Sequence, residues 1–198
     1  DIENGCICGM TIIVNQNGER VFKGVFTNDL FGEISDDTLY RIASMSKPIT
    51  AVAIMILRDR GLLSIDDPVS KYLPAFAEMN IGKLDDNGNA IFESKAEKQI
   101  RIRDLLTHSS GLGSNVMGVR AWDKRPENCR DSLEKSVDYY AETFLAFEPG
   151  SVPMYSPAMA FDVLGRIVEI LSGKSLEEFF QDEIFIPLGM TNTTFDPT

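Results

Sequence analysis

The chain has 198 residues, of which 43% are hydrophobic and 25% charged, the mixture typical of a soluble globular protein with one domain or two small ones. Its 30 acidic and 19 basic residues give a formal charge of -11. This argues against a nucleic-acid partner, because phosphate binding needs clustered Lys and Arg. A solvated acidic surface is the simpler explanation, with an adaptation to cationic substrates as the alternative. No apolar run approaches the length of a membrane span.

Neither a leader nor a metal site is visible in the sequence. Residues 1–9 lack a basic stretch followed by an apolar one, which is the mark of a signal peptide. A leader that had been removed would leave the same sequence, so the compartment, cytoplasmic or exported, stays open. Cys6, Cys8 and Cys129 are too few for a disulfide framework. Together with the single histidine, His108, they also lack the spacing of a metal site, so we expect structural cysteines and no metal.

Turn signals between apolar runs predict two hairpins. Residues 8–14 and 19–26 are rich in apolar side chains, and Asn15-Gln16-Asn17-Gly18 lies between them. This is the pattern of a β-hairpin. Lys83 to Phe92 carries Asn87-Gly88 between apolar flanks, so we expect a second, smaller hairpin there.

The strongest helix of the chain follows the first hairpin. Apolar residues recur at helical spacing from Ile49 to Leu57, and Gly61 supplies a stop signal. Pro48 fits only the first turn of such a helix, where its missing N–H costs nothing. This places Ser44 at the helix start or just before it.

The rest of the chain is predicted to be mainly helical. Helices are expected at 102–106, 132–147 and 159–171, and a further one is capped by Ser175 with an acidic residue three positions later. Residues 113–128 have no clear periodicity and are expected to be irregular. Strands come first and helices later without alternation, which argues against a Rossmann-like sheet.

The pattern Ser-x-x-Lys occurs twice, at Ser44–Lys47 and at Ser132–Lys135, and only the context separates the two. A helix start offers Ser44 free N–H groups and positive potential, which stabilise an oxyanion. Lys47 lies one turn further on the same face, and a neutral lysine there could accept the serine proton. A helix cap followed by a surface lysine is the alternative. Ser132 lies in a charged helical stretch and is interpreted as part of a solvated face.

Several stretches match the segments of one family, in the order that the family has them. They are residues 38–50 (Thr-Leu-Tyr-Arg-Ile-Ala-Ser-Met-Ser-Lys-Pro-Ile-Thr), 61–69, 71–74, 102–112 and 187–191. On these residues the chain resembles the serine β-lactamase-related family, which holds class C β-lactamases, D-alanyl-D-alanine peptidases and β-lactamase-like carboxylesterases. The resemblance covers nearly the whole chain.

The resemblance implies an α+β fold of the β-lactamase and penicillin-binding-protein type. Residues 1–62 would be the N-terminal part of a sheet domain, with a hairpin and the nucleophile helix, and residues 63–198 a mainly helical domain. The family's activity implies acyl transfer through Ser44, activated by Lys47, with no metal or organic cofactor. The segment 113–128 would overlie the site.

The family's second motif, Tyr-x-Asn, corresponds here to Tyr155-Ser156-Pro157. The resemblance implies that Tyr155 takes part in proton transfer at Ser44. In β-lactamases of the family the asparagine helps hold the substrate's side-chain amide, and Pro157 has no amide to offer. This weakens a β-lactamase function and favours the esterase branch.

The family's third motif, Lys-Thr-Gly or His-x-Gly, is absent from the sequence. The resemblance places Thr198 in the middle of the enzyme, so we expect the C-terminal sheet strands, one wall of the site and the second oxyanion N–H to lie outside this chain. The C-terminal half of the same enzyme would then be a partner, supplied within a longer protein or as a separate chain. A single hairpin is marginal in water, so the 198 residues alone are not expected to form a complete site.

His108 invites a Ser-His-Asp interpretation, but the sequence has no Gly-x-Ser-x-Gly elbow. In the family this stretch is structural, so a His108→Ala variant is expected to keep activity. We therefore expect a serine hydrolase that acts on a small-molecule ester or amide, carboxylesterase-like. A β-lactamase or D-alanyl-D-alanine carboxypeptidase is one alternative, and a non-catalytic or incomplete member that retains the fold is another.

Overall fold

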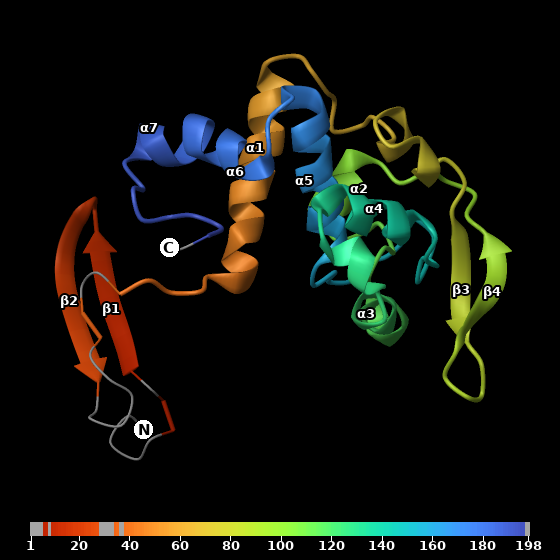
Figure 1. Cartoon of the computed structure of the whole chain (residues 1–198), viewed down its shortest axis with the longest axis horizontal. Coiled ribbons are helices and arrows are strands. Elements are labelled where there is room, and N and C mark those ends of the chain that lie inside the picture. The colour runs from red at the N-terminus through yellow and green to blue at the C-terminus, as the bar shows by residue number, and fades with distance from the viewer. Residues whose placement is uncertain (1–5, 8, 28–33, 36–37, 197–198) are drawn as a thin grey trace. The chain divides into compact units, whose positions relative to one another are not determined.

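A computed structural model describes residues 6–7, 9–27, 34–35 and 38–196 (Figure 1). Contacts within the chain separate two compact units, one before residue 42 and one that spans Ile42–Asp196. Each unit is treated by itself below. The two expected domains, 1–62 and 63–198, stay a prediction.

The first unit contains the expected N-terminal hairpin. Strand β1 (Gly9–Gln16) pairs antiparallel with β2 (Glu19–Thr27). Asn17 and Gly18 have φ angles of +53° and +84°, the left-handed conformation that a tight hairpin turn needs. The hydroxyl groups of Thr11 and Tyr40 lie 2.8 Å apart, which ties the segment after the hairpin to β1. Cys8 lies outside the described residues.

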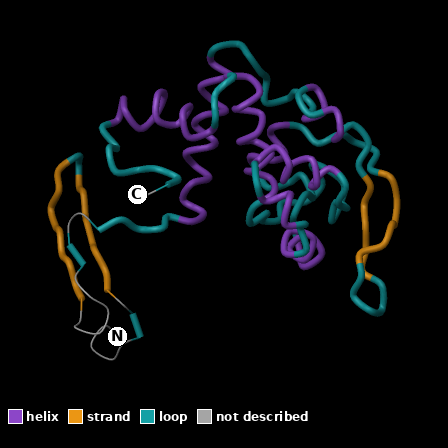
Figure 2. Tube along the Cα trace, viewed as in Figure 1, coloured by secondary structure: helices purple, strands orange, loops and turns teal. Residues whose placement is uncertain are grey.

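The second unit is mainly helical, with one small hairpin (Figure 2). Its helices are α1 (Ser46–Asp59), α2 (Ile102–Leu106), α3 (Asn115–Asp123), α4 (Leu133–Ala141), α5 (Met159–Ser172), α6 (Leu176–Phe180) and α7 (Ile186–Leu188). Strands β3 (Asn80–Leu84) and β4 (Ala90–Lys95) pair antiparallel. Mixed helices and strands agree with the expected α+β class.

Helix α5 forms the centre of the core. Helices α1, α2, α4 and α6 all pack against it, and its side chains Val163, Leu164, Ile167 and Val168 are fully buried. Gly165 allows close packing, because a Cβ there would lie 3.0 Å from the Leu176 side chain. The helix ends where the left-handed Gly173 provides the C-terminal cap.

Helix α1 begins and ends where the sequence predicts. The tight turn Ala43–Met45 leads directly into it, and Pro48 falls in its first turn. Ala53, Ile54 and Leu57 are fully buried, as their spacing along one face requires. The helix stops before Gly61, which has a φ of +73°. Ser44 therefore lies just before the helix, in the turn that opens it.

Two expectations for the middle of the chain are wrong. Residues 113–128 are not irregular, because they hold α3; the side chain of Asn115 caps it by accepting hydrogen bonds from the N–H groups of Met117 and Gly118. A Cβ on Gly118 would come within 2.4 Å of Gly113, so glycine lets α3 pack closely on the preceding loop.

The expected helix 132–147 is also too long, since α4 ends at Ala141. The Thr143 hydroxyl donates to the carbonyl of Tyr140, and the N–H of Leu145 donates to the carbonyl of Asn80. The first bond closes the end of the helix, and the second attaches the chain to β3 instead.

The last helical segment follows its predicted capping box. Ser175 and Glu178 exchange side-chain and backbone hydrogen bonds at the start of α6. The helix continues through a wider π-helical turn, Gln181–Phe185, into α7 and ends at the left-handed Gly189. Among the described residues, no helix is both long and apolar enough to cross a membrane.

Candidate active site

The turn before α1 presents Ser44 to solvent. Ser44 and Met45 are exposed, and Ala43 has a φ of +45°, a conformation that costs a residue with a Cβ about 1 to 2 kcal/mol. Such strain concentrates at functional sites. The first N–H groups of a helical segment have no intrahelical acceptor, so the backbone at Ser44 is suited to bind an oxyanion.

The Lys47 ammonium is aimed at Ser44. Its Nζ lies 3.2 Å from Ser44 Oγ and donates to the carbonyl oxygen of Pro157 at 2.6 Å. The same nitrogen lies 5.2 Å from the centre of the Tyr155 ring and 5.7 Å from that of Phe161. Pro157 has no side-chain amide, but its backbone fixes the lysine beside the serine.

Tyr155 also contacts Ser44, although the two residues are 111 positions apart in the sequence. Its hydroxyl donates to Ser44 Oγ at 2.7 Å. The hydrogen bond with Ser44 and the neighbouring Lys47 both lower the pKa of Tyr155. A lowered pKa raises the fraction of Tyr155 that is phenolate near neutral pH, and the phenolate is the form that can accept a proton. Ser44, Lys47 and Tyr155 thus meet at one oxygen, and their chemical roles remain predictions.

His108 lies behind Tyr155 and makes no hydrogen bond to Ser44. Its Nδ1 accepts from the backbone N–H of Ser156 at 3.2 Å, and its ring lies 4.7 Å from the Tyr155 ring and 5.3 Å from that of Phe161. Burial, and to a lesser degree Lys47, lower the His108 pKa. A neutral ring packed on Tyr155 fits a structural role better than that of a general base.

The second Ser-x-x-Lys pattern does not form a comparable pair. The Ser132 hydroxyl caps α4 by accepting from the N–H of Lys135, and Lys135 Nζ pairs with Asp131 at 2.8 Å. Each polar group is used locally, as the interpretation of a solvated helix face requires.

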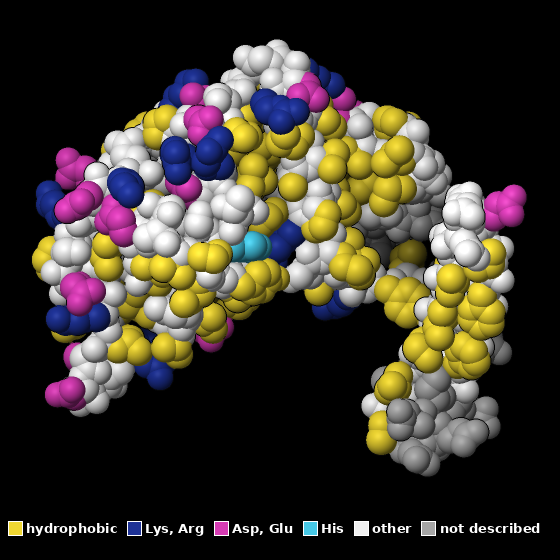
Figure 3. Space-filling model, turned by 180° about the vertical axis from the view of Figure 1, so that it is seen from behind, with side chains coloured by type: hydrophobic (Ala, Val, Ile, Leu, Met, Phe, Trp, Pro, Cys, Tyr) yellow, Lys and Arg dark blue, Asp and Glu magenta, His cyan; other side chains and the backbone are white. Residues whose placement is uncertain are grey.

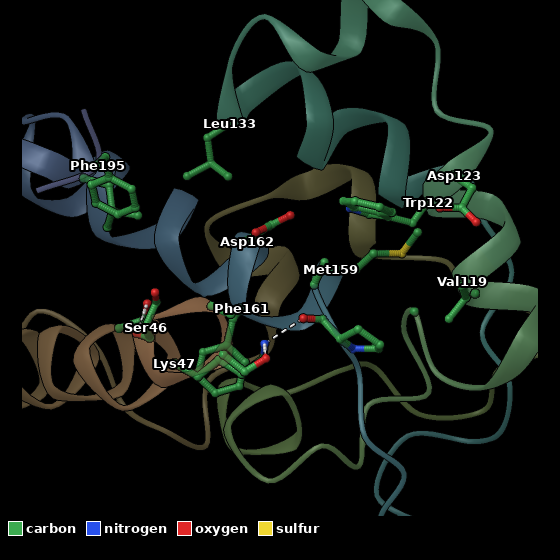
Figure 4. Close-up of a pocket in the computed structure, with 18 residues that line it drawn as sticks. Ser46, Lys47, Val119, Trp122, Asp123, Leu133, Met159, Phe161, Asp162 and Phe195 are labelled. Atoms are coloured by element: carbon green, nitrogen blue, oxygen red, sulfur yellow. Dashed lines mark hydrogen bonds between the residues drawn. The ribbon is translucent and has the colours of Figure 1, made fainter. Parts of the chain in front are cut away.

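A cavity of about 590 Å³ opens beside Ser44 and Lys47. Figure 4 shows its wall: Val119 and Trp122 come from α3, and Met159, Phe161 and Asp162 from the first turn of α5. We call it the α3–α5 cavity. The segment 113–128 was expected to overlie the site, and α3 does line this cavity.

Sequence reasoning missed Asp162 as a cavity residue. The sequence does show an acidic side chain in the first turn of an otherwise apolar helix. A favourable interaction with the helix dipole explains such a residue equally well. Only the packing of α4 on α5 shows that the Tyr140 hydroxyl donates to Asp162 at 2.8 Å. No single-sequence pattern links residues 140 and 162.

The surface of the second unit separates apolar from charged side chains. Figure 3 shows hydrophobic side chains in a broad band, with Lys and Arg beside Asp and Glu along one edge. The ion pairs of this unit include Lys71 with Asp67 at 2.9 Å and Lys174 with Asp182 at 2.7 Å.

The fold and the serine–lysine–tyrosine cluster define a protein of the serine β-lactamase type. The Beta-lactamase family profile matches residues 3–198, so the chain belongs to this family. It is 37% identical over 169 residues to a lovastatin esterase of Penicillium rubens, an alignment that covers 82% of this chain and 40% of that protein.

The chain is also similar to proteins whose names give other activities. The chain is 31% identical over 192 residues to the D-alanyl-D-alanine-carboxypeptidase/endopeptidase AmpH of Escherichia coli K12, covering 96% of this chain and 46% of the relative. The solved structure of unliganded simvastatin synthase (LovD) from Aspergillus terreus matches with a TM-score of 0.76 at 25% identity, over 98% of this chain and 52% of that one. The chain therefore spans about half the length of these relatives or less. The similarities support a hydrolase and leave its specific activity open.

Proposed function

We propose that this protein is a serine hydrolase that transfers the acyl group of a small ester through an acyl-enzyme on Ser44. The observation that carries the proposal is the convergence of Lys47 Nζ and the Tyr155 hydroxyl on Ser44 Oγ, at 3.2 and 2.7 Å. A nucleophile with a lysine and a tyrosine in hydrogen-bond reach meets the geometric requirement for activation by a base.

In the first step Ser44 Oγ attacks the substrate carbonyl carbon. The hydroxyl proton passes to the phenolate oxygen of Tyr155, which becomes a neutral phenol; Lys47 beside it favours the phenolate before the transfer. The Ser44 N–H donates to the carbonyl oxygen as it becomes an oxyanion. The bond from carbon to the leaving oxygen then breaks, and that oxygen takes the proton from Tyr155.

Deacylation repeats the same chemistry with water. A water molecule loses its proton to Tyr155, attacks the acyl carbon and releases the carboxylic acid as Ser44 regains its proton. Tyr155 has a lowered pKa, so kcat/KM should rise with pH to a plateau that begins below the ordinary tyrosine pKa of about 10.

An ester is a better substrate than a penicillin because of Pro157. The motif position that would offer a side-chain amide offers only a carbonyl, and Lys47 already occupies it at 2.6 Å. A D-alanyl-D-alanine carboxypeptidase is the second candidate, and the similarity to AmpH favours it. Turnover of an acetyl ester and of a D-alanyl-D-alanine peptide by the same preparation would rank the two.

We further propose that sequence outside residues 1–198 completes the site, either in the same polypeptide or in a partner chain. It would supply the third motif and the second oxyanion donor. The relatives' greater length supports this, since the chain covers only 40% and 46% of two of them. The alternative, an inactive member that keeps the fold, predicts no covalent labelling at Ser44.

The deciding experiment is the intact mass after exposure to a fluorophosphonate probe. The complete protein is compared with Ser44→Ala and with Ser132→Ala, which carries the same change in the other Ser-x-x-Lys pattern. We expect one label on the wild type and on Ser132→Ala and none on Ser44→Ala. Labelling that survives Ser44→Ala would refute Ser44 as the nucleophile, and an unlabelled wild type would favour the inactive alternative.

The same experiment on residues 1–198 alone tests whether outside sequence is needed. We expect this chain to remain unlabelled and to become labelled when its missing part is added. Labelling of the 198 residues by themselves, at the rate of the complete protein, would contradict the need for further sequence.

A further inference from the structure

The α3–α5 cavity beside the nucleophile is apolar except at a few points. Among the side chains that line it, only Lys47, Asp123 and Asp162 ionise. Lys47 is already committed to Ser44 Oγ and to the Pro157 carbonyl. The two remaining ionisable groups, which Ser44 and Pro157 do not engage, are both carboxyls.

A chain of hydrogen bonds from Arg125 through Tyr140 holds the Asp162 carboxyl in place. Its Oδ2 accepts from the Tyr140 hydroxyl at 2.8 Å, and that hydroxyl accepts from Arg125 Nη1 at 2.7 Å. Tyr140 is fully buried, which holds the carboxyl in one orientation. The other oxygen, Oδ1, has no hydrogen-bond donor among the described residues. In Figure 4 the labelled Asp162 carboxyl lies on the wall between Leu133 and Met159.

The ionised form of Asp162 is only partly stabilised by its surroundings. Burial raises the pKa of this carboxyl, against the opposing effects of Tyr140, Arg125 and Lys47. A cation placed at Oδ1 would offset the cost of ionising a partly buried carboxylate. Asp123, which is exposed and lines the same cavity, adds attraction for a positive group that enters.

We propose that the α3–α5 cavity receives the acyl chain of the substrate, and that Asp162 binds a protonated amine at the end of that chain. Trp122, Met159 and Phe161 would cover the methylene groups, which suits an apolar chain with one charged terminus. The substrate class is thus an ester of an ω-amino acid with an aliphatic chain. This inference rests on the proposed acyl transfer at Ser44.

The test compares two esters of equal chain length on the complete protein. One is p-nitrophenyl 6-aminohexanoate, and the other is p-nitrophenyl heptanoate, which has a methyl group in place of the ammonium. We expect the wild type to favour the amino ester in kcat/KM by about tenfold to a hundredfold, the range for a hydrogen bond to a charged group. A wild-type preference for the neutral ester would overturn the proposal without any variant.

Asp162→Asn supplies the second measurement, because it keeps the size and an acceptor for Tyr140 while it removes the charge. We expect the ratio of the two kcat/KM values to fall by tenfold or more. The matched control is Asp138→Asn, the same change at an exposed residue of α4 that does not line the cavity, and its ratio should stay at the wild-type value. Circular dichroism and thermal melting check that both variants fold.

The outcomes separate this inference from the proposed function. If Ser44→Ala abolishes hydrolysis of both esters while Asp162→Asn leaves their ratio unchanged, acyl transfer stands and the amine site is wrong. If neither ester is hydrolysed and the probe does not label Ser44, the proposed function itself fails. If Asp162→Asn does not fold, the wild-type ratio alone decides between an amine site and a purely structural carboxyl.

Discussion

Helix α5 and the hairpin of β1 and β2 are both rich in apolar residues, but they bury them very differently. In α5, Leu164 and Val163 are 0% exposed, whereas in the hairpin Val21 is 55% and Phe22 46% exposed. Successive strand residues face opposite sides of a sheet, so the hairpin has half-exposed apolar side chains on both faces. Composition alone does not distinguish the two regions; the presence of packing partners does.

The same contrast separates the regions by function. Ser44, Lys47 and Tyr155 all belong to the unit that builds its own core, on or beside helices that α5 anchors. Catalytic groups need rigid support, because small displacements cost large factors in rate.

The largest expected effect is on catalysis, and it is tested with one tyrosine from each unit. Tyr155→Phe removes the hydroxyl that lies 2.7 Å from Ser44 Oγ and should lower kcat by about a hundredfold to ten-thousandfold, the usual range for a lost acid–base group. Tyr40→Phe removes a hydroxyl bonded to Thr11 and should leave kcat unchanged. Steady-state hydrolysis of one ester measures both. Equal losses of kcat in the two variants would contradict the assignment of catalysis to the second unit alone.

The next effect is on stability, with one truncation in each region. Leu164→Ala empties a fully buried site in α5 and should lower the free energy of unfolding by about 2 to 5 kcal/mol. Val21→Ala shortens a half-exposed side chain and should cost about 0.5 kcal/mol or less. Urea unfolding of the complete protein, followed by circular dichroism, gives both values. A cost at Val21 close to that at Leu164 would show that another layer covers the hairpin.

Much of this architecture could be predicted because the signals are local. Helix α1 follows from its apolar spacing, Pro48 and Gly61, and the first hairpin follows from Asn17-Gly18 between apolar runs. The order of segments such as 102–112 and 187–191 also led to the family, which the match over residues 3–198 confirms.

The features that sequence reasoning missed depend on contacts between distant residues. Helix α4 ends early because Leu145 bonds to Asn80, and α3 forms on a close approach of Gly118 to Gly113. The link from Tyr140 to Asp162 is likewise tertiary. Local propensity carries no information about such partners.

A smaller effect concerns acid stability within the helical unit. Asp67 accepts from Lys71, Tyr72 and the N–H of Ser64, and these bonds lower its pKa to about 2. The folded pKa lies below the unfolded value of about 3.9, so the stabilisation is present above pH 4 and is lost as the pH falls toward 2. Its size is about 1 to 2 kcal/mol after allowance for solvent exposure.

Asp67→Asn should therefore lower the unfolding free energy at pH 7 and flatten its pH dependence between pH 4 and 2. Glu19→Gln, at an exposed residue of the hairpin, should do neither. Chemical unfolding at several pH values gives the two curves. A wild-type slope retained in Asp67→Asn would assign the acid sensitivity to other carboxyls.

The smallest expected effect is at His108, which supports Tyr155 without touching Ser44. His108 has a φ of +56°, so alanine would add backbone strain, whereas asparagine tolerates this conformation and keeps an acceptor for the Ser156 N–H. His108→Asn should reduce kcat by less than about tenfold, since only ring packing on Tyr155 and Phe161 is lost. A triad histidine would cost far more, on the order of a ten-thousandfold or greater. The pH profile separates the two cases: because Tyr155 and Lys47 set the proton transfer, the limb that rises with pH should keep its position in His108→Asn, and its disappearance would make His108 the base.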